Sequence, residues 1–288
     1  ISKCKIGQCM YVLLTEKNGG IVNDPVLLKL EENHFWLSIA DSDVLLWCLG
    51  IASSNNFDVK ICEPDASPLS LQGPKSPEVM AKVSGEWVKE LKFFYFKKFK
   101  IQNIPVIIAR SGWSGEAGYE IYLLDETKGN ILWEIIMEAG RDCNIAPACP
   151  SQINRIECGM LSYGSDMTLL ENPYDISLGK FVNLNKKADF LSKDALKKIE
   201  QKGISRELVG VEIMEKTSTD FIRDHLPIYK NNMVIGKITS SVYSPRLKKN
   251  IGLAIINKDN KNSNDLKLEY NGKNIKINIT ELPFLRNK

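Results

Sequence analysis

The segment at residues 110–122, RSGWSGEAGYEIY, combines the residue types that can hold a flat, polar ring. Its loop contains three glycines and two serines, and the chain then enters a strand at YEIY. Strand alternation puts Glu120 and Tyr122 on one face and the other two residues on the opposite face. A carboxylate beside an aromatic ring, behind glycines that allow close backbone approach, suits a heterocycle with ring N–H donors. The alternative is a β-hairpin with a solvated glutamate on its outer face.

Several other catalytic chemistries find little support in the sequence. The only histidines are His34, at a charged strand entrance, and His225, in a polar turn, so we expect both at the surface rather than beside a nucleophile. Residues 73–76, GPKS, lack the first glycine of a phosphate-binding loop, and the proline removes a backbone donor. No GxGxxG motif follows a strand and no cluster has zinc-ligand spacing, so we expect no metal site.

Five segments in order along the chain resemble one known family, the glycine cleavage T-proteins. They are GQCMYVLLTEKNGGIVNDPV (7–26), SLQGPKS (70–76), RSGWSGEAGYEIY (110–122), RIECGMLSYGSDM (155–167) and SPRLKKNIGLAII (244–256). Within the family, the sequence looks most similar to the branch of dimethylsulfoniopropionate demethylases. The features that favour this branch are Trp113 in place of the usual tyrosine, WLSIADSDVLLW (36–47), NPYDISLG (172–179) and the closing LPF (282–284).

The resemblance implies an enzyme that moves a one-carbon unit onto tetrahydrofolate, and it assigns roles at the glycine-rich segment. Glu120 would hold the aminopyrimidine edge of the pterin by paired hydrogen bonds. Tyr122 would line the same pocket, and Trp113 would stack near the reacting centre. The alternative for Trp113 is an ordinary core or surface aromatic residue.

The resemblance also places Asn23 and Asp24 at the catalytic end of the folate. The family has two consecutive aspartates at these positions, and the carboxylate they provide lies near the N5/N10 edge of the folate. Asn23 takes the place of the first aspartate and so departs from the family pattern. A carboxylate assists aminomethyl transfer because protons must be managed at the folate nitrogens. A sulfonium is already activated and needs mainly alignment and a dry pocket, and its charge favours an aromatic face such as Trp113. Alternatively, Asp24 before Pro25 is a turn at a strand end.

Further site residues follow from the resemblance alone. Tyr11, Ser38 and Arg110 match positions that line the active-site cleft in the demethylase branch, although Arg110 can also be read as a surface cation. Arg246 would meet the glutamate tail of the folate.

The composition is that of an ordinary globular protein. The chain has 288 residues, 43% hydrophobic and 25% charged, which predicts about two domains. A net charge of +3 is too small and too evenly spread to indicate nucleic acid, although it tolerates an anionic ligand. Seven scattered cysteines without a CxxC motif indicate reduced thiols in the cytoplasm, and no apolar run is long enough to span a membrane. Family members carry several dozen residues before the position of Gly7, so we expect the first elements to be missing.

The expected fold class is α+β, a mixed sheet-and-helix body followed by a small β-barrel. In the family this body consists of two ferredoxin-like lobes. A turn at 18–20 joins the first strands, residues 41–42 and Ser192 are expected to cap helices, and Gly203 is the best boundary. We therefore expect a folate-binding catalytic domain at 1–203 and a barrel domain at 204–288. The strands expected in the body lie at 10–14, 21–30, 34–39, 57–63, 93–99, 103–109 and 119–122, with helices at 44–53, 77–83, 126–139, 152–162 and 192–202. Those of the barrel lie at 208–213, 227–229, 234–241, 252–256, 266–270 and 273–279.

The function that these expectations favour is demethylation of dimethylsulfoniopropionate, a small sulfonium substrate, to methylthiopropionate with formation of 5-methyltetrahydrofolate. One alternative is the aminomethyltransferase of the glycine cleavage system, which would release ammonia and use a lipoyl carrier protein as partner. Another is a folate-binding protein without turnover, although the reactive cysteine motif of those relatives is not found. Neither a nucleic acid nor a membrane is expected as a partner, and a homodimer is left open.

Overall fold

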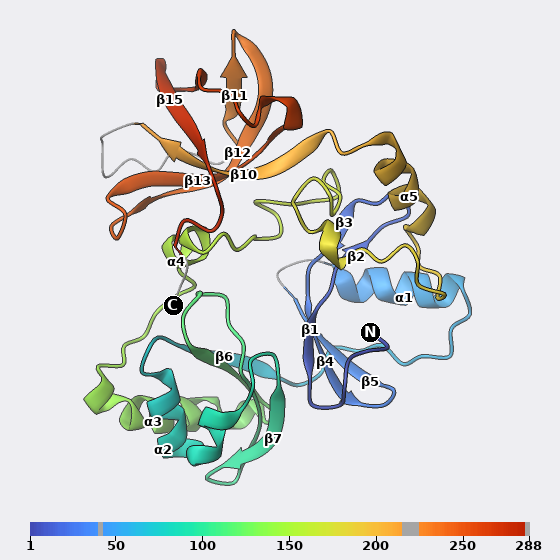
Figure 1. The fold of residues 1–288 in the computed structure, drawn as a ribbon. Helices are drawn as coiled ribbons and strands as arrows, with labels where there is room; N and C mark the ends of the chain where they lie inside the picture. Colours follow the sequence, from blue (N-terminus) through green and yellow to red (C-terminus); the bar gives the residue numbers. More distant parts are fainter. Residues whose placement is uncertain (40–42, 215–224, 286–288) are drawn as a thin grey trace. The chain divides into compact units, whose positions relative to one another are not determined.

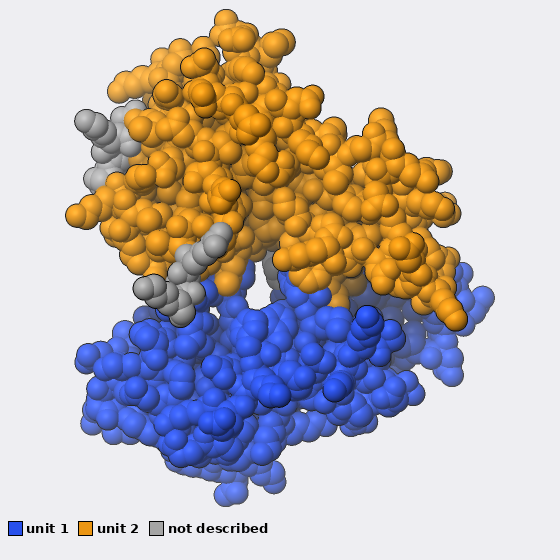
Figure 2. Space-filling view, in the orientation of Figure 1, with its two compact units in different colours: residues 1–11, 25–150 blue, residues 12–24, 151–288 orange. Residues whose placement is uncertain are grey.

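The computed structural model describes residues 1–39, 43–214 and 225–285 of the chain (Figure 1). The chain divides into two compact units, which are coloured separately in Figure 2. Unit 1 contains residues 1–11 and 25–150, and unit 2 contains residues 12–24 and 151–288. The short segment 12–24 therefore belongs with the C-terminal half of the chain. The predicted domain boundary at Gly203 stays a prediction, because these packing units divide the chain at other positions.

The first sheet of unit 1 has three antiparallel strands in the order β1–β4–β5. They are β1 (Cys9–Tyr11), β4 (Val26–Glu31) and β5 (His34–Ser38). The register pairs Tyr11 with Val26 and Val26 with Ser38, so these three residues form one row across the sheet. Neighbouring strands lie about 4.8 Å apart, which puts Tyr11 and Ser38 about 10 Å from each other on the same face.

The second sheet of unit 1 has four antiparallel strands in the order β6–β9–β8–β7. They are β6 (Ser67–Gln72), β7 (Phe96–Ile101), β8 (Ile104–Ala109) and β9 (Gly118–Leu123). Helices α2 (Ser76–Ser84) and α3 (Gly129–Ala139) pack side by side against one face of this sheet (Figure 1). Helix α1 (Val44–Ser54) precedes this sheet in the chain.

Strand β9 has a different hydrophobic core on each face. Tyr119 and Ile121 pack with α2 and α3, whereas Tyr122 packs in a second core with residues of both sheets, including Leu28 and Ile107. The alternation predicted from YEIY is therefore confirmed. The face that carries Glu120 and Tyr122 is the one that meets the three-stranded sheet.

The described residues of unit 2 form a hairpin, two α-helices, short 3-10 turns and a closed barrel. The hairpin is β2 (Leu14–Thr15) and β3 (Ile21–Asn23), and the helices are α4 (Gln152–Glu157) and α5 (Lys193–Lys202). The barrel has the order β10–β13–β12–β11–β14–β15, which confirms the predicted C-terminal barrel and the α+β class. Its strands are β10 (Arg206–Ile213), β11 (Pro227–Lys230), β12 (Met233–Ser244), β13 (Lys249–Asn257), β14 (Leu266–Tyr270) and β15 (Lys273–Thr280).

The hairpin is held by residues from much later in the chain. The Ile21 N–H donates to the Glu171 carbonyl at 3.0 Å, and the Thr15 and Ser192 hydroxyls lie 2.7 Å apart. A Cβ added at Gly20 would lie 2.2 Å from the Leu169 carbonyl oxygen, so only glycine permits this close approach. The hairpin therefore completes the packing of unit 2.

Three local predictions were wrong and one cannot be compared. Described residues 57–63 pair with no neighbouring strand, and the edge position beside β9 belongs to β6 instead. Helix α4 ends at Glu157 rather than near residue 162. Ser192 occupies the N-cap position of α5, but its hydroxyl contacts Thr15 rather than the helix. The predicted cap at residues 41–42 lies outside the described residues.

In the parts of the chain that the structure describes, no helix is both long and apolar enough to cross a membrane.

Candidate active site

Glu120 lies on the central strand β9, on the face that meets the three-stranded sheet. Its neighbours in the sheet register are Ala109 on β8 and Ser70 on β6. The Glu120 carboxylate is half-buried and accepts a hydrogen bond from the hydroxyl of Ser111, which is itself buried. Glu120 is therefore a fixed carboxylate at the edge of a core rather than a solvated side chain on an outer face.

Tyr122 lies two residues after Glu120, on the same face of β9, and its hydroxyl adds a second polar group at the edge of this core. Its ring packs edge-on against Trp36, with centroids 6.1 Å apart and ring planes at 65°. Burial raises the pKa of the Tyr122 phenol, the negative charge of Glu120 raises it further, and the adjacent Ser38 hydroxyl opposes the shift. Although Ser38 and Glu120 lie beside it, the buried hydroxyl makes no well-aligned hydrogen bond within the described residues. Tyr122 is thus a neutral phenol with a buried hydroxyl beside the Glu120 carboxylate.

Tyr11 and Ser38 border this region from the three-stranded sheet. They lie on either side of Val26, and Tyr11 shares a strand face with Cys9, which packs in the same core as Tyr122. Burial, followed by the charge of Glu120, raises the pKa of the Cys9 thiol to about 12. Cys9 is therefore a protonated packing residue and not a nucleophile. The structure brings the predicted residues Tyr11, Ser38, Glu120 and Tyr122 to the facing surfaces of the two sheets.

The loop between β8 and β9 carries two more predicted residues. Trp113 is half-buried within this loop, between Gly112 and Ser114. Arg110 donates from Nη1 to the Leu91 carbonyl at 2.7 Å and, more weakly, to the Lys89 carbonyl at 3.4 Å. The Arg110 guanidinium therefore binds backbone carbonyls of unit 1. It is not the fully solvated cation of the alternative interpretation, and these contacts do not direct it at Glu120.

Asn23 and Asp24 lie in unit 2, at the end of β3. Asn23 is 0% exposed, and its side-chain oxygen accepts a hydrogen bond from the Asp24 N–H at 2.9 Å. Burial raises the pKa of the Tyr163 phenol, and the charge of Asp24 contributes to this shift, so the two side chains are neighbours. The predicted catalytic pair is therefore a buried amide followed by a carboxylate near a phenol.

Arg246 lies in the turn between β12 and β13 and forms an ion pair with the buried carboxylate of Glu157 on α4. Its Nη2 also donates to the Asn154 side chain at 3.3 Å. Ser244 donates to the same Glu157 carboxylate. These contacts of Arg246 therefore join the barrel to α4.

Sequence reasoning missed Ser111, which holds the Glu120 carboxylate. Ser111 is the first residue after Arg110, where a serine in a glycine-rich loop gives no local signal of a buried contact. Register supplies the missing information, since β8 and β9 pair Ala109 with Glu120 and so bring residue 111 beside the carboxylate.

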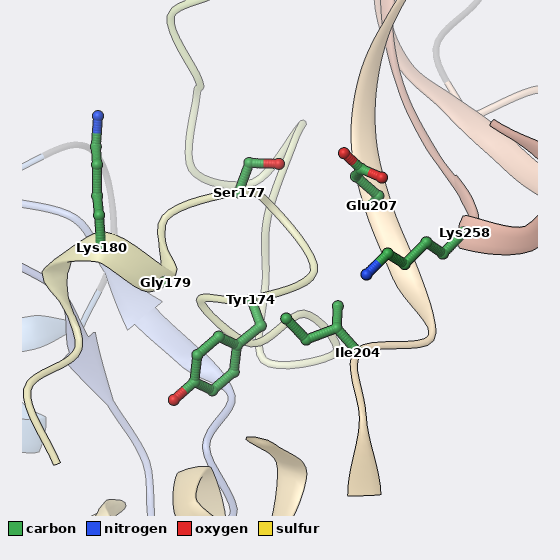
Figure 3. Close-up of a pocket in the computed structure, with 7 residues that line it drawn as sticks. All are labelled: Tyr174, Ser177, Gly179, Lys180, Ile204, Glu207 and Lys258. Atoms are coloured by element: carbon green, nitrogen blue, oxygen red, sulfur yellow. The ribbon is translucent and has the colours of Figure 1, made fainter. Parts of the chain in front are cut away.

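A separate cavity of about 290 Å³ lies in unit 2 (Figure 3). None of the predicted site residues lines it, and its walls mix the Tyr174 and Ile204 side chains with ionic groups. Figure 3 shows the Lys258 side chain reaching between Glu207 and Ile204, whereas the Tyr174 hydroxyl points away from them. We assign the candidate site to the Glu120 region rather than to this cavity, because only the former combines buried polar groups with the glycine-rich loop.

Two sequence profiles together cover most of the chain. The profile of the GCVT N-terminal domain matches residues 1–186, and that of the glycine cleavage T-protein C-terminal barrel domain matches residues 206–285. The chain therefore belongs to the glycine cleavage T-protein family. It is an enzyme of the class of tetrahydrofolate-dependent one-carbon transferases.

The chain is similar to one demethylase and to several aminomethyltransferases. Dimethylsulfoniopropionate demethylase DmdA of Ruegeria pomeroyi is 39% identical over 251 residues, which cover 87% of this chain and 68% of that protein. The aminomethyltransferase of Caldanaerobacter subterraneus subsp. tengcongensis is 34% identical over 262 residues, covering 89% and 69%. The crystal structure of the glycine cleavage system aminomethyltransferase T from Bartonella henselae matches with a TM-score of 0.82 at 27% identity, covering 99% of this chain and 78% of that one.

The residues around Glu120 fit tetrahydrofolate as a ligand. The Glu120 carboxylate is held in place by Ser111 and accepts hydrogen bonds, which is what the N–H donors of a pterin require. The buried Tyr122 hydroxyl beside it lacks a well-aligned partner among the described residues, and buried polar groups are rarely left unsatisfied. Both groups lie at the edge of an apolar core, as is typical of small-molecule sites.

Proposed function

We propose that this enzyme demethylates dimethylsulfoniopropionate and transfers the methyl group to tetrahydrofolate. The observation that carries the proposal is the greater identity to a protein named as this demethylase than to the aminomethyltransferases compared. Two features of the chain agree with it, the buried amide of Asn23 and the indole of Trp113 in the glycine-rich loop. Free cysteines, seven in all, agree with a reducing compartment such as the cytoplasm.

The proposed reaction is a direct displacement. Tetrahydrofolate supplies the accepting nitrogen N5, whose lone pair forms the new N–CH3 bond as the S–CH3 bond breaks. The electron pair of the broken bond goes to sulfur, which leaves as the neutral thioether methylthiopropionate, and the N5 proton passes to solvent. Because the leaving group is neutral, the protein has to align the reactants and exclude water more than it has to transfer protons.

Each residue then has a role that matches this demand. Glu120 and Tyr122 bind the pterin edge, with Tyr11 and Ser38 beside them, and the Trp113 indole faces the sulfonium. Asn23 is buried, so an amide there avoids the free-energy cost of burying a second carboxylate next to Asp24. Asp24 is the one carboxylate of the pair and orients the reacting groups. Arg246 meets the glutamate tail, with Glu157 fixing its guanidinium, and Arg110 supports the loop through the Leu91 carbonyl.

The experiment that tests the proposal is mass spectrometry of the folate product. The protein is incubated with tetrahydrofolate and dimethylsulfoniopropionate, and the expected product is 5-methyltetrahydrofolate together with methylthiopropionate. A parallel reaction contains an aminomethylated lipoyl carrier protein as donor. Formation of 5,10-methylenetetrahydrofolate and ammonia only in this second reaction would refute the demethylase and identify a glycine cleavage aminomethyltransferase, with the carrier protein as its partner.

A folate-binding protein without turnover is separated by a third measurement. Calorimetric binding of tetrahydrofolate in the absence of product from either donor would identify it. A matched Glu120→Gln variant shows whether the binding occurs at the proposed site. The oligomeric state, including a homodimer, is obtained from light scattering of the same sample.

A further inference from the structure

The side chain of Gln72, at the end of β6, stands inside the loop that joins β8 to β9. Its Nε2 donates to the Ser111 carbonyl at 3.2 Å and to the Tyr119 carbonyl at 3.4 Å. Its Oε1 accepts a hydrogen bond from the Ser114 hydroxyl at 2.7 Å. Ser111 lies near the start of the loop, Ser114 lies in its middle and Tyr119 lies just beyond it on β9. One amide therefore connects both ends of the loop with its centre.

Two glycines, Gly112 in the loop and Gly118 at the start of β9, make room for this amide. A Cβ added at Gly112 would lie 2.1 Å from the Gln72 Oε1, and one added at Gly118 would lie 2.2 Å from the same atom. Neither glycine has a positive φ, so an alanine could adopt the backbone conformation at both positions. A side chain at either position would therefore displace the Gln72 amide, whereas the path of the backbone itself does not demand glycine.

The same contacts lead from Gln72 to the candidate site. Ser111, whose carbonyl Gln72 holds, is only 3% exposed and donates its hydroxyl to the Glu120 carboxylate. Trp113 lies in the loop between Gly112, which packs on the amide, and Ser114, which donates to it. A displacement of Gln72 would therefore move the partner of Glu120 and the two neighbours of Trp113 together.

The geometry points to Gln72 as the positioning residue of the site: its amide holds the loop that sets Glu120 for the folate and Trp113 for the methyl donor. This inference rests on the proposed function, because it takes Glu120 as the folate-binding carboxylate. Gln72 acts through Ser111 and the loop backbone and contacts no substrate. An amide suits the position because it provides two N–H donors and an acceptor, and all three partners require that combination.

The sharpest test is Gln72→Glu, which preserves size and replaces the N–H donors by a carboxylate that faces two backbone carbonyls. We expect the dissociation constant for tetrahydrofolate to rise about 10- to 100-fold, the range for the loss of one hydrogen bond to a charged group such as Glu120. The KM for folate should rise more than kcat falls, because binding of the pterin depends on the position of Glu120. Far-UV circular dichroism verifies the fold, and Gln201→Glu on the exposed surface of α5 is the matched control with the same change of charge.

A steric double-mutant cycle tests the same contact without any change of charge. Gly118→Ala alone should weaken folate binding, because its methyl group overlaps the Gln72 amide. In the Gln72→Ala background the amide is gone, so adding Gly118→Ala should weaken folate binding by at least about threefold less than it does in the wild type. The control is Gly50→Ala on α1, where an added Cβ meets nothing within 4 Å. It should leave folate binding unchanged in both backgrounds.

The results separate this inference from the proposed function. If wild-type protein binds tetrahydrofolate and Gln72→Glu binds it equally well, Gln72 does not position the site, whereas the proposed function stands. Additive effects in the steric cycle would lead to the same conclusion. If the wild-type protein itself binds no tetrahydrofolate, the proposed function is refuted, and the assignment of Gln72 to a folate site is refuted with it.

Discussion

Replacement of Glu120 by glutamine tests the candidate site most directly. The substitution keeps the shape of the side chain and leaves one oxygen that can still accept the Ser111 hydroxyl. It removes the negative charge and replaces the second oxygen by an NH2 group. In the proposed complex this NH2 group would face an N–H donor of the pterin, so one charge-assisted hydrogen bond is lost.

The magnitude follows from that single loss. A hydrogen bond to a charged group contributes about 1.5–3 kcal/mol, which corresponds to an increase of about 10- to 140-fold in the dissociation constant for tetrahydrofolate. The fold should be unaffected, since Glu120 is only half-buried and its contact with Ser111 is retained. A decrease in folate affinity without a change in the free energy of unfolding is therefore the expected pattern.

Isothermal titration calorimetry of tetrahydrofolate with wild type, Glu120→Gln and a control measures the effect. Glu134→Gln is the matched control, because Glu134 is an exposed residue of α3, which packs on the opposite face of the same sheet. Equal affinities for all three proteins would remove Glu120 from the folate site and contradict the assignment of the whole facing surface. Equal weakening by both variants would indicate a general effect of net charge instead.

Three further predictions concern the donor, the stability of unit 2 and a buried thiol. Trp113→Ala should weaken binding of the sulfonium donor by about 0.5–2 kcal/mol beyond lost packing while Trp113→Phe keeps part of it, and calorimetry with an uncharged thioether of the same shape should show no such loss. If Trp113→Ala weakens folate as much as the donor, the indole contacts the pterin instead. Asp166→Asn should lower the free energy of unfolding by about 3–5 kcal/mol in urea titrations, because it removes the negative charge of a buried ion pair, in which the Arg155 guanidinium is 1% exposed and lies 2.7 Å from Asp166; a change below about 1 kcal/mol would contradict this. The pKa of the Cys9 thiol is raised to about 12, so between about pH 9 and 12 the folded protein keeps this proton while the unfolded chain loses it. The free energy of unfolding should therefore fall as the pH rises through this range, and it should fall less steeply in Cys9→Ala. Mass mapping with iodoacetamide should show the exposed Cys62 alkylated well before Cys9, and equal rates would show that Cys9 is accessible.

The parts of the fold that could be predicted are those in which local pattern and long-range pairing agree. Glu120 and Tyr122 share a face because strand alternation depends only on neighbouring residues. The six barrel strands were located because turn residues separate short alternating runs, as at Asn271, whose φ of 50° suits the hairpin turn to β15. These signals depend on only a few consecutive residues.

The parts of the fold that could not be predicted depend on which of several distant segments pairs with a given strand. Residues 57–63 have the alternation of a strand, yet Phe57 and Val59 are exposed, and β6 pairs with β9 in the edge position of that sheet. Nothing local distinguishes the two segments, because strand formation requires a partner. Gln72 and Ser111 were missed as site residues for the same reason, since their role arises from contacts across 39 positions of sequence.

The assignment of the β2–β3 hairpin to unit 2 has a consequence for synthesis of the protein in the cell. Thr15 leaves the ribosome 177 positions before its partner Ser192. At about 5–20 residues per second, the hairpin waits roughly 9–35 s for that contact. During this time residues 25–150, the larger part of unit 1, are translated and can fold while the partners of the hairpin do not yet exist. Release of a nascent chain near residue 150 would therefore yield a folded N-terminal body with an unprotected hairpin, a natural point of recognition for chaperones and proteases.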